Sequence, residues 1–124
     1  MKNQFVGYKE SKKLSKLGFS EECFGGYLKK DKTIWIGYVS SQGGEQFNRY
    51  YHILAPTFSQ AFKFFREKYD LYYTIEGSKK YGFAFFIYYE NDDKGELKSK
   101  EYSTYEEAEQ ECIVKLIEIT KENK

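Results

Sequence analysis

The sequence predicts an α+β fold of two βββα units, which form antiparallel sheet, carry two capped helices and follow a short amino-terminal helix. The first observation is a repeated segment, because Thr57-Phe58-Ser59-Gln60-Ala61 returns as Thr104-Tyr105-Glu106-Glu107-Ala108. The second is that each copy follows three strand-like runs and opens a run with helical spacing of apolar residues. The six strands are expected to form one continuous sheet or two facing sheets, with both helices on a common side.

Length and composition set the scale of the protein. A chain of 124 residues is expected to form a single α+β domain, with a helical lead-in and two units at 1–22, 23–69 and 70–124. Aromatic residues make up 20% of the chain, with 13 Tyr and 11 Phe. Rings must therefore supply much of the core. A phenol buries its ring while its hydroxyl stays in water, so half-buried tyrosines are expected at the surface.

The elements of the first unit are read in chain order. A helix is expected over 8–17, with Gly18 and Phe19 as a left-handed stop followed by an apolar residue. Strands are expected over 23–28, 33–40 and 47–54. Gly25 and Gly26 weaken the first and suggest a bulge or a close backbone approach. The run 33–40 is apolar on both faces, which is typical of a central strand.

The second unit repeats this order after a helix over 58–69, which Pro56 separates from the preceding strand. Thr57 with Gln60, and Thr104 with Glu107, form capping boxes at the starts of the two long helices. Strands are expected over 71–76, 81–90 and 96–102. The last of these is polar and contains two lysines, which is typical of an exposed edge strand.

Charge and cysteine content restrict the class of protein. The formal net charge of +1 argues against a general affinity for polyanions. Residues 1–32 carry a net charge of +4 and residues 104–124 one of −3, which we interpret as solvated faces. Cys23 and Cys112 form no CxxC pair, and Cys112 is expected to be a small buried hydrophobe. No leader or apolar run long enough for a membrane span is seen, so a cytoplasmic protein without membrane contact is expected.

One segment resembles a nucleic-acid-binding signature. Gly82-Phe83-Ala84-Phe85-Phe86-Ile87-Tyr88 is similar to the central-strand motif of the RNA-recognition motif. In that family, aromatic side chains on an open sheet stack on unpaired bases, and Phe83 and Phe85 would be the stacking rings. Tyr81 stands where the motif has a basic residue, and Phe86 replaces an aliphatic one. No residues remain after the last helix for the closing strand of that family.

Catalytic and metal-binding patterns are weak. His52 is the only histidine, and within its strand it is expected to face opposite to Tyr51 and Ile53. No nucleophile or carboxylate motif accompanies it. Asp92 and Asp93 lie in a hairpin signal but lack the closing glutamate of a calcium loop. We therefore expect no enzyme activity, no cofactor and no metal.

A polar and aromatic cluster could recognise a ligand. Arg49, with Asn48, Tyr50 and Tyr51 beside it, could bind a carboxylate or phosphate. The favoured alternative is a cross-strand ion pair between Arg49 and an acid such as Glu45 or Glu76. The candidate binding surface that the sequence predicts consists of Trp35, Arg49, Tyr50, Phe83, Phe85 and Tyr88.

Several phrases together resemble a known group of proteins: Leu17-Gly18-Phe19, Glu22-Cys23-Phe24, Ala55-Pro56-Thr57-Phe58-Ser59-Gln60-Ala61-Phe62, Phe65-Arg66-Glu67-Lys68, Thr104-Tyr105-Glu106-Glu107-Ala108-Glu109 and Lys115-Leu116-Ile117-Glu118. They are similar to small α+β proteins encoded by gut Bacteroidetes and their bacteriophages, a group with no assigned activity. The resemblance implies a phage or mobile-element product acting in a bacterial cytoplasm.

The sequence therefore predicts a non-enzymatic module that binds a protein partner or associates with its own copy as a homodimer. The aromatic sheet surface and the edge strand over 96–102 are the expected contact regions. Two alternatives remain open. One is single-stranded nucleic-acid binding led by Phe83, Phe85, Trp35 and Tyr88. The other is sequestration of a small molecule around Arg49 and Tyr50.

Overall fold

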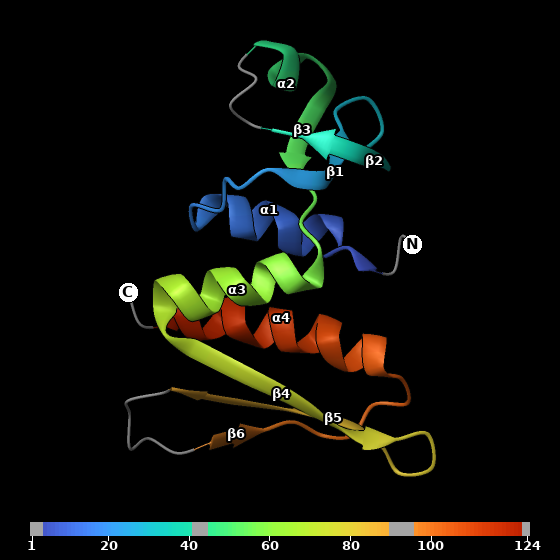
Figure 1. Ribbon diagram of the computed structural model, residues 1–124, viewed down its shortest axis with the longest axis vertical. Helices are drawn as coiled ribbons and strands as arrows, with labels where there is room; N and C mark the ends of the chain where they lie inside the picture. Colours follow the sequence, from blue (N-terminus) through green and yellow to red (C-terminus); the bar gives the residue numbers. More distant parts are fainter. Residues whose placement is uncertain (1–3, 41–44, 90–95, 123–124) are drawn as a thin grey trace. The chain divides into compact units, whose positions relative to one another are not determined.

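The computed structural model describes residues 4–40, 45–89 and 96–122 (Figure 1). The chain divides into two compact units, Met1–Ala61 and Phe62–Lys124, and the boundary falls inside helix α3 (Phe58–Tyr69). Each unit contains a three-stranded antiparallel sheet. The α+β fold with antiparallel sheets and a short amino-terminal helix is therefore confirmed, and the described strands form two sheets.

The amino-terminal helix α1 (Tyr8–Lys16) ends as the sequence predicts. Gly18 has a φ of 104°, which places it in the region that glycine adopts readily. The Phe19 N–H donates to the Leu14 carbonyl at 3.0 Å, and the Gly18 N–H donates to the Ser15 carbonyl at 3.1 Å. These two bonds define a Schellman motif, which satisfies carbonyls that the helix end would otherwise leave unpaired.

The first sheet places a different strand at its centre from the one expected. Its strands are β1 (Cys23–Leu28), β2 (Ile34–Val39) and β3 (Tyr51–Leu54), in the order β2-β1-β3. The prediction that 33–40 is a central strand is wrong, because β2 lies at the edge. The glycine-containing strand is central because rings cover it closely: a Cβ at Gly25 would lie 2.9 Å from the Phe5 ring, and one at Gly26 2.7 Å from the Tyr51 ring.

The strand expected over 47–54 is half helix. A short helix α2 (Glu45–Tyr50) precedes β3, so extended backbone begins only at Tyr51. Strand propensity does not explain this helical turn, because Phe47 and Tyr50 belong to types that are enriched in strands. The helical turn stacks the Phe47 ring on the Tyr51 ring, with centroids 5.8 Å apart.

The core of the first unit joins α1 to the sheet. Phe5, Tyr27, Ile53 and Ala55 form a buried cluster. The Tyr27 hydroxyl donates to the Val6 carbonyl at 2.7 Å, and its burial raises its pKa to about 12. The ring is thus buried with its polar end satisfied, in agreement with the expectation that aromatic residues build the core.

Both capping boxes are confirmed. At the start of α3, the Gln60 N–H donates to Thr57 Oγ1 at 3.2 Å, and the Thr57 N–H donates to Gln60 Oε1 at 3.1 Å. At the start of α4 (Tyr105–Glu122), the Glu107 N–H donates to Thr104 Oγ1 at 3.1 Å. The Glu107 carboxylate also accepts hydrogen bonds from the hydroxyls of Ser103 and Thr104.

The second sheet is a simple meander. Its strands are β4 (Leu71–Ser78), β5 (Gly82–Tyr89) and β6 (Glu96–Lys98), in the order β4-β5-β6. The edge position of the last strand is confirmed, although its regular part has only three residues, followed by an isolated bridge between Phe83 and Tyr102. Helix α4 lies along one face of this sheet (Figure 1). The two sheets thus differ in which strand is central, and the first also has helix α2 between its second and third strands in the chain.

Candidate binding sites

The candidate residues from the sequence fall into two groups. Trp35, Arg49 and Tyr50 belong to the first unit, whereas Phe83, Phe85 and Tyr88 belong to the second. Trp35 lies on β2, Arg49 and Tyr50 lie in α2, and the other three residues lie on β5.

In the second unit, the two rings expected to stack on bases face the helix. The Phe83 ring contacts Tyr105, the first residue of α4, with centroids 6.0 Å apart, and the Phe85 ring stacks on Tyr102 at 6.3 Å. Phe85 is only 4% exposed. Its ring therefore has no face available for a base, and the likeness of this strand to the RNA-recognition motif does not extend to the position of its rings.

The open face of the second sheet carries the alternate residues. Tyr88 lies on this face, and its ring stacks on that of Tyr72 on β4, with centroids 5.9 Å apart. Lys98 on β6 places its Nζ 5.8 Å from the centroid of the Phe86 ring. Glu76 occupies the same face. Three half-buried rings are thus flanked by charges of both signs.

In the first unit, the cluster around Arg49 is not assembled as expected. Arg49 lies in the last turn of α2, so the strand position assumed for the cross-strand ion pair is wrong. Its guanidinium carbon lies 5.9 Å from the centroid of the exposed Tyr50 ring, which is a cation–π geometry. Tyr51 belongs to a different contact, with Phe47 and Trp35.

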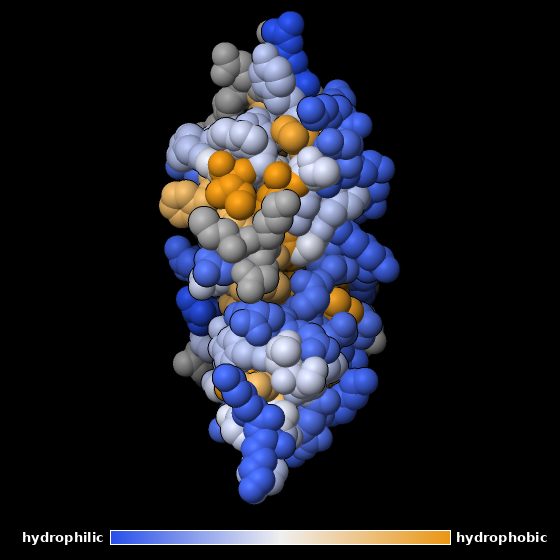
Figure 2. Space-filling view, turned by 90° about the vertical axis from the view of Figure 1, so that its right-hand side faces the viewer, coloured by the Kyte–Doolittle hydropathy of each residue, from blue (hydrophilic) through white to orange (hydrophobic). Residues whose placement is uncertain are grey.

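Strand β2 is the most exposed apolar element of the first unit. Trp35, Ile36 and Tyr38 are 43%, 37% and 64% exposed, and Phe24 on neighbouring β1 is 64% exposed. Within the described residues, β2 pairs with β1 along one edge only. Its six residues include no charged residue and no proline. Figure 2 shows its largest orange area over the first unit, on the side toward which β2 lies in Figure 1.

Three rings of the first unit contact one another in a row, which we call the ring row: Phe47, Tyr51 and Trp35. The Tyr51 centroid lies 5.8 Å from that of Phe47 and 5.9 Å from that of Trp35. Glycines make room for the row. A Cβ at Gly37 would lie 2.3 Å from the Trp35 ring. The ring row therefore connects the edge strand to helix α2.

The two ends of β2 carry opposite charges. The turn before it contains Lys29, Lys30, Asp31 and Lys32. Glu21 and Glu22 precede β1, whose first residue pairs with Val39 at the far end of β2. A hydrogen bond with Glu22, its main cause, raises the pKa of Tyr38, which places that carboxylate beside the end of β2.

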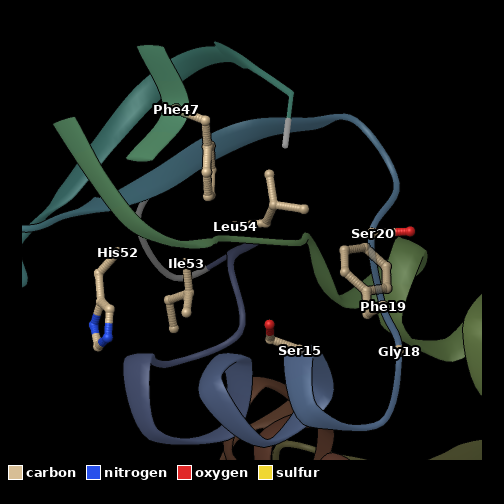
Figure 3. Close-up of a pocket in the computed structure, with 8 residues that line it drawn as sticks. All are labelled: Ser15, Gly18, Phe19, Ser20, Phe47, His52, Ile53 and Leu54. Carbon is tan, nitrogen blue, oxygen red and sulfur yellow. The ribbon is translucent and has the colours of Figure 1, made fainter. Parts of the chain in front are cut away.

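A pocket of about 250 Å³ lies between α1, β3 and the Phe47 side chain (Figure 3). Its apolar walls are Phe19, Phe47, Ile53 and Leu54. The Ser15 hydroxyl points into it from the last turn of α1 (Figure 3). His52 lines one side, and the pocket is open to solvent because Ser15, Gly18, Ser20 and His52 are all exposed. Eight residues line the pocket: Ser15, Gly18, Phe19, Ser20, Phe47, His52, Ile53 and Leu54.

His52 lies differently from the expected alternation. Its side chain and that of Ile53 both point toward α1, whereas Leu54 points to the opposite side (Figure 3). The physical reason is an irregularity in the pairing of β1 with β3, between Tyr27 and Leu28. Nδ1 of His52 lies 2.7 Å from the Tyr8 hydroxyl, so a hydrogen bond from α1 fixes the ring.

The thiols are unreactive in character. Both cysteines are buried and free, and the expected burial of Cys112 is confirmed. Burial raises the pKa of Cys23 to about 12, with Glu21 adding to the effect, and burial likewise raises that of Cys112. Among the described residues, no three His, Cys, Asp or Glu side chains are grouped as metal ligands. Asp92 and Asp93 lie outside the described residues.

The exposed edge of β2 was not predicted from the sequence, although one signal of it was present. The run 33–40 contains no charge, and an apolar strand is equally typical of a sheet centre and of an edge that pairs with another chain.

No helix in the part of the chain that the structure describes combines the length and apolar character needed to cross a bilayer.

The fold and these sites define a small α+β protein with an exposed, uncharged sheet edge and a separate pocket. Comparison with protein-family models, curated proteins and solved structures found no significant match.

Proposed function

We propose that this protein is a self-associating module in which strand β2 of one copy pairs antiparallel with β2 of a second copy. The observation that carries the proposal is the exposed, uncharged edge of β2 with Trp35, Ile36 and Tyr38 on it. Natural proteins usually protect such an edge with charges, proline, bulges or shortness, because unpaired N–H and C=O groups recruit another strand. Strand β2 has an irregularity in its pairing with β1 but no charge and no proline, so its edge is only partly protected and is consistent with a strand that is normally paired.

The edge strand that the sequence predicted as the contact region fits this role less well. Strand β6, the contact region expected from the sequence, has only three regular residues and ends with Lys98. A short, charged strand offers few backbone groups and resists pairing. The aromatic surface of the first sheet therefore supports the proposal, with β2 as the contact strand.

Symmetry determines which side chains would meet. Two antiparallel copies of one strand are related by a two-fold axis normal to the sheet, which keeps each face of the sheet on its own side. Ile36 and Trp35 are neighbours on the regular part of β2 and so lie on opposite faces, whereas the pairing of β1 with β2 is irregular between Ile36 and Val39. Ile36, near the middle of the strand, would lie close to its counterpart across the axis, and Trp35 would pack on the opposite face beside the ring row.

Charge complementarity favours a second copy as the partner. Antiparallel pairing brings the lysine-rich turn at the start of one β2 toward Glu21 and Glu22 at the end of the other. Within one copy these groups are separated by the length of the strand, about 20 Å at the usual rise per residue. That distance exceeds the screening length of about 8 Å at physiological salt, so the attraction acts chiefly between copies.

Analytical ultracentrifugation of Ile36→Lys tests the proposal. The two-fold axis repeats the substitution in both copies and brings two like charges together, so the dissociation constant should rise at least tenfold. Tyr81→Lys is the matched control, because Tyr81 is an exposed ring of the second unit, 74% exposed, and its dissociation constant should not change. A wild-type protein that is still monomeric at a concentration of about 100 μM would refute the proposal.

A charge swap separates pairing from general stickiness. Lys30→Glu or Glu21→Lys alone should weaken association, and the two substitutions in one chain should restore it. A mixture of the two single variants, Lys30→Glu and Glu21→Lys, should form heterodimers in preference to homodimers. If the double variant associates as weakly as the single ones, antiparallel pairing of β2 is excluded.

Single-stranded nucleic-acid binding is the second candidate, and the stacked pair Tyr72 and Tyr88 on the open face of the second sheet favours it. Base stacking on aromatic rings is tolerant of sequence and depends strongly on salt. Fluorescence anisotropy with labelled oligonucleotides tests this, and Tyr88→Ala should weaken any binding. The resemblance to phage-encoded proteins supports a bacterial cytoplasm as the place of action for either function.

A further inference from the structure

We propose that the pocket between α1 and β3 binds a small neutral aromatic molecule that carries one hydrogen-bonding group. This site is independent of the β2 edge. All eight lining residues lie within the first unit, so the pocket is complete in a single copy.

The size of the pocket limits the ligand to one or two fused rings. A dry cavity of about 150 Å³ is enough to bind benzene. At about 250 Å³, this pocket is larger than that. It is also smaller than the roughly 300–1,000 Å³ typical of sites for drug-sized ligands. A bicyclic molecule such as indole fits between these limits.

The walls favour an aromatic body. Phe19 and Phe47 line two sides of the pocket, and Ile53 and Leu54 line it from strand β3. In Figure 3 the Phe47 ring hangs from α2 above the pocket, while Phe19 closes the side beside the loop that follows α1. Ring walls of this kind stack on, or meet edge to face with, a flat apolar ligand.

The polar groups define one end of the ligand. The Ser15 hydroxyl points into the space between Ile53 and Phe19 (Figure 3). A hydroxyl can donate or accept, so it can pair with an N–H or an O–H of the ligand. The Tyr8 hydroxyl, 2.7 Å from Nδ1, holds the His52 ring at the opposite side.

The lining explains why the ligand should be neutral. None of the eight residues is Lys, Arg, Asp or Glu. A carboxylate or ammonium group would lose part of its water against the buried walls without gaining a charged partner, so it should bind more weakly than a neutral group. Neutral aromatic alcohols, phenols and indoles are therefore the matching class.

The test uses indole as the probe and NMR amide shifts as the readout. Indole should shift the amide signals of Gly18 and Leu54 in a saturable manner, whereas Gly82 in the second unit should not move. Indene has the same shape without the N–H, and it should bind about threefold to tenfold more weakly, the worth of one hydrogen bond. Indole-3-acetate, which is anionic, should bind more weakly than indole.

Two substitutions at Ser15 divide the proposal into its parts. Ser15→Phe should fill the pocket and abolish the shifts for both ligands. Ser15→Ala should abolish only the preference for indole over indene. The matched controls are Ser59→Phe and Ser59→Ala, because Ser59 is an exposed serine on another helix, and these should leave binding unchanged.

Three results would overturn the proposal. Amide signals around the pocket that stay fixed up to the solubility limit of indole would show that the pocket takes no such ligand. Unchanged binding in Ser15→Phe, in a variant whose spectrum remains folded, would place the ligand elsewhere. Equal binding of indole-3-acetate and indole would refute the requirement for a neutral molecule.

Discussion

Replacing Gly26 with alanine tests the close approach of a ring to the central strand of the first sheet. A Cβ at this position would lie 2.7 Å from Cδ1 of Tyr51 and 3.2 Å from Cγ1 of Val39. Ordinary van der Waals contacts begin at 3.4 Å, so the Tyr51 ring has to move by roughly 1 Å. Overpacking of this kind costs about 1–3 kcal/mol.

A smaller effect opposes this cost. Alanine restricts the unfolded chain more than glycine does, which stabilises the protein by about 0.4–1 kcal/mol where the native backbone suits alanine. The net expected loss for Gly26→Ala is therefore about 1–2 kcal/mol. In urea this should lower the unfolding midpoint by roughly 0.5–1 M. The native emission of Trp35 should also change, because its ring lies 5.9 Å from that of Tyr51.

A double-mutant cycle identifies the cause. In a Tyr51→Ala background the ring is absent, so Gly26→Ala should change stability by no more than about 0.5 kcal/mol. An equal loss in both backgrounds would refute the reasoning, because the cost would then arise from the backbone or from Val39. The measurement is the free energy of unfolding from urea titrations of the four proteins.

Three further predictions concern the caps and the thiols. Thr57→Ala and Thr104→Ala should each lower the free energy of unfolding by about 1 kcal/mol, whereas Ser59→Ala, beyond the cap, should change it little. Hydrogen bonds from the hydroxyl of Ser103, the larger cause, and from that of Thr104 lower the pKa of Glu107. The Glu107 carboxylate therefore stabilises the fold above the ordinary carboxyl pKa, and this stabilisation is lost as the pH falls through the lowered pKa of the folded protein. The difference in free energy of unfolding between wild type and Glu107→Gln should vanish in acid, and a difference that stays constant with pH would contradict this. With a pKa of about 12, Cys23 should react with a disulfide reagent on the order of a thousandfold more slowly in the native protein than in urea, and fast labelling of one native thiol would be the contrary result.

Local signals in the sequence predicted local structure well. The capping boxes at Thr57 and Thr104 and the glycine stop at Gly18 each involve residues within a few positions of one another. Their hydrogen bonds depend on backbone geometry over a single turn, and so a short segment contains the whole cause.

The arrangement of strands depends on distant residues, and there the sequence was misleading. In the sequence, Gly25 and Gly26 indicate a weak strand. The structure shows that the rings of Phe5 and Tyr51 lie against these two glycines. The run from Ile34 to Val39 resembles a central strand because apolar residues occupy both faces. Periodicity records that a side chain is apolar but does not reveal what it contacts.

The candidate site shows the same division. Two residues of the candidate binding surface, Trp35 and Tyr50, are exposed in the structure. Phe83 and Phe85 were assigned to an open face, but the pleat of β5 turns them toward α4. Because side chains alternate along a strand, an error of one position exchanges the two faces. The pocket joins residues 15–20 to 47–54, so no single motif could reveal it.

The difference in strand order has a consequence for how the chain acquires its structure. In the second half, β5 pairs with the strands immediately before and after it, so each closure spans a short loop. In the first half, Gly26 must find Leu54 across the intervening β2 and α2. Closing a longer loop costs more entropy and slows the search. The carboxyl-terminal hairpins should therefore gain protection from solvent exchange earlier during refolding than the amino-terminal sheet does.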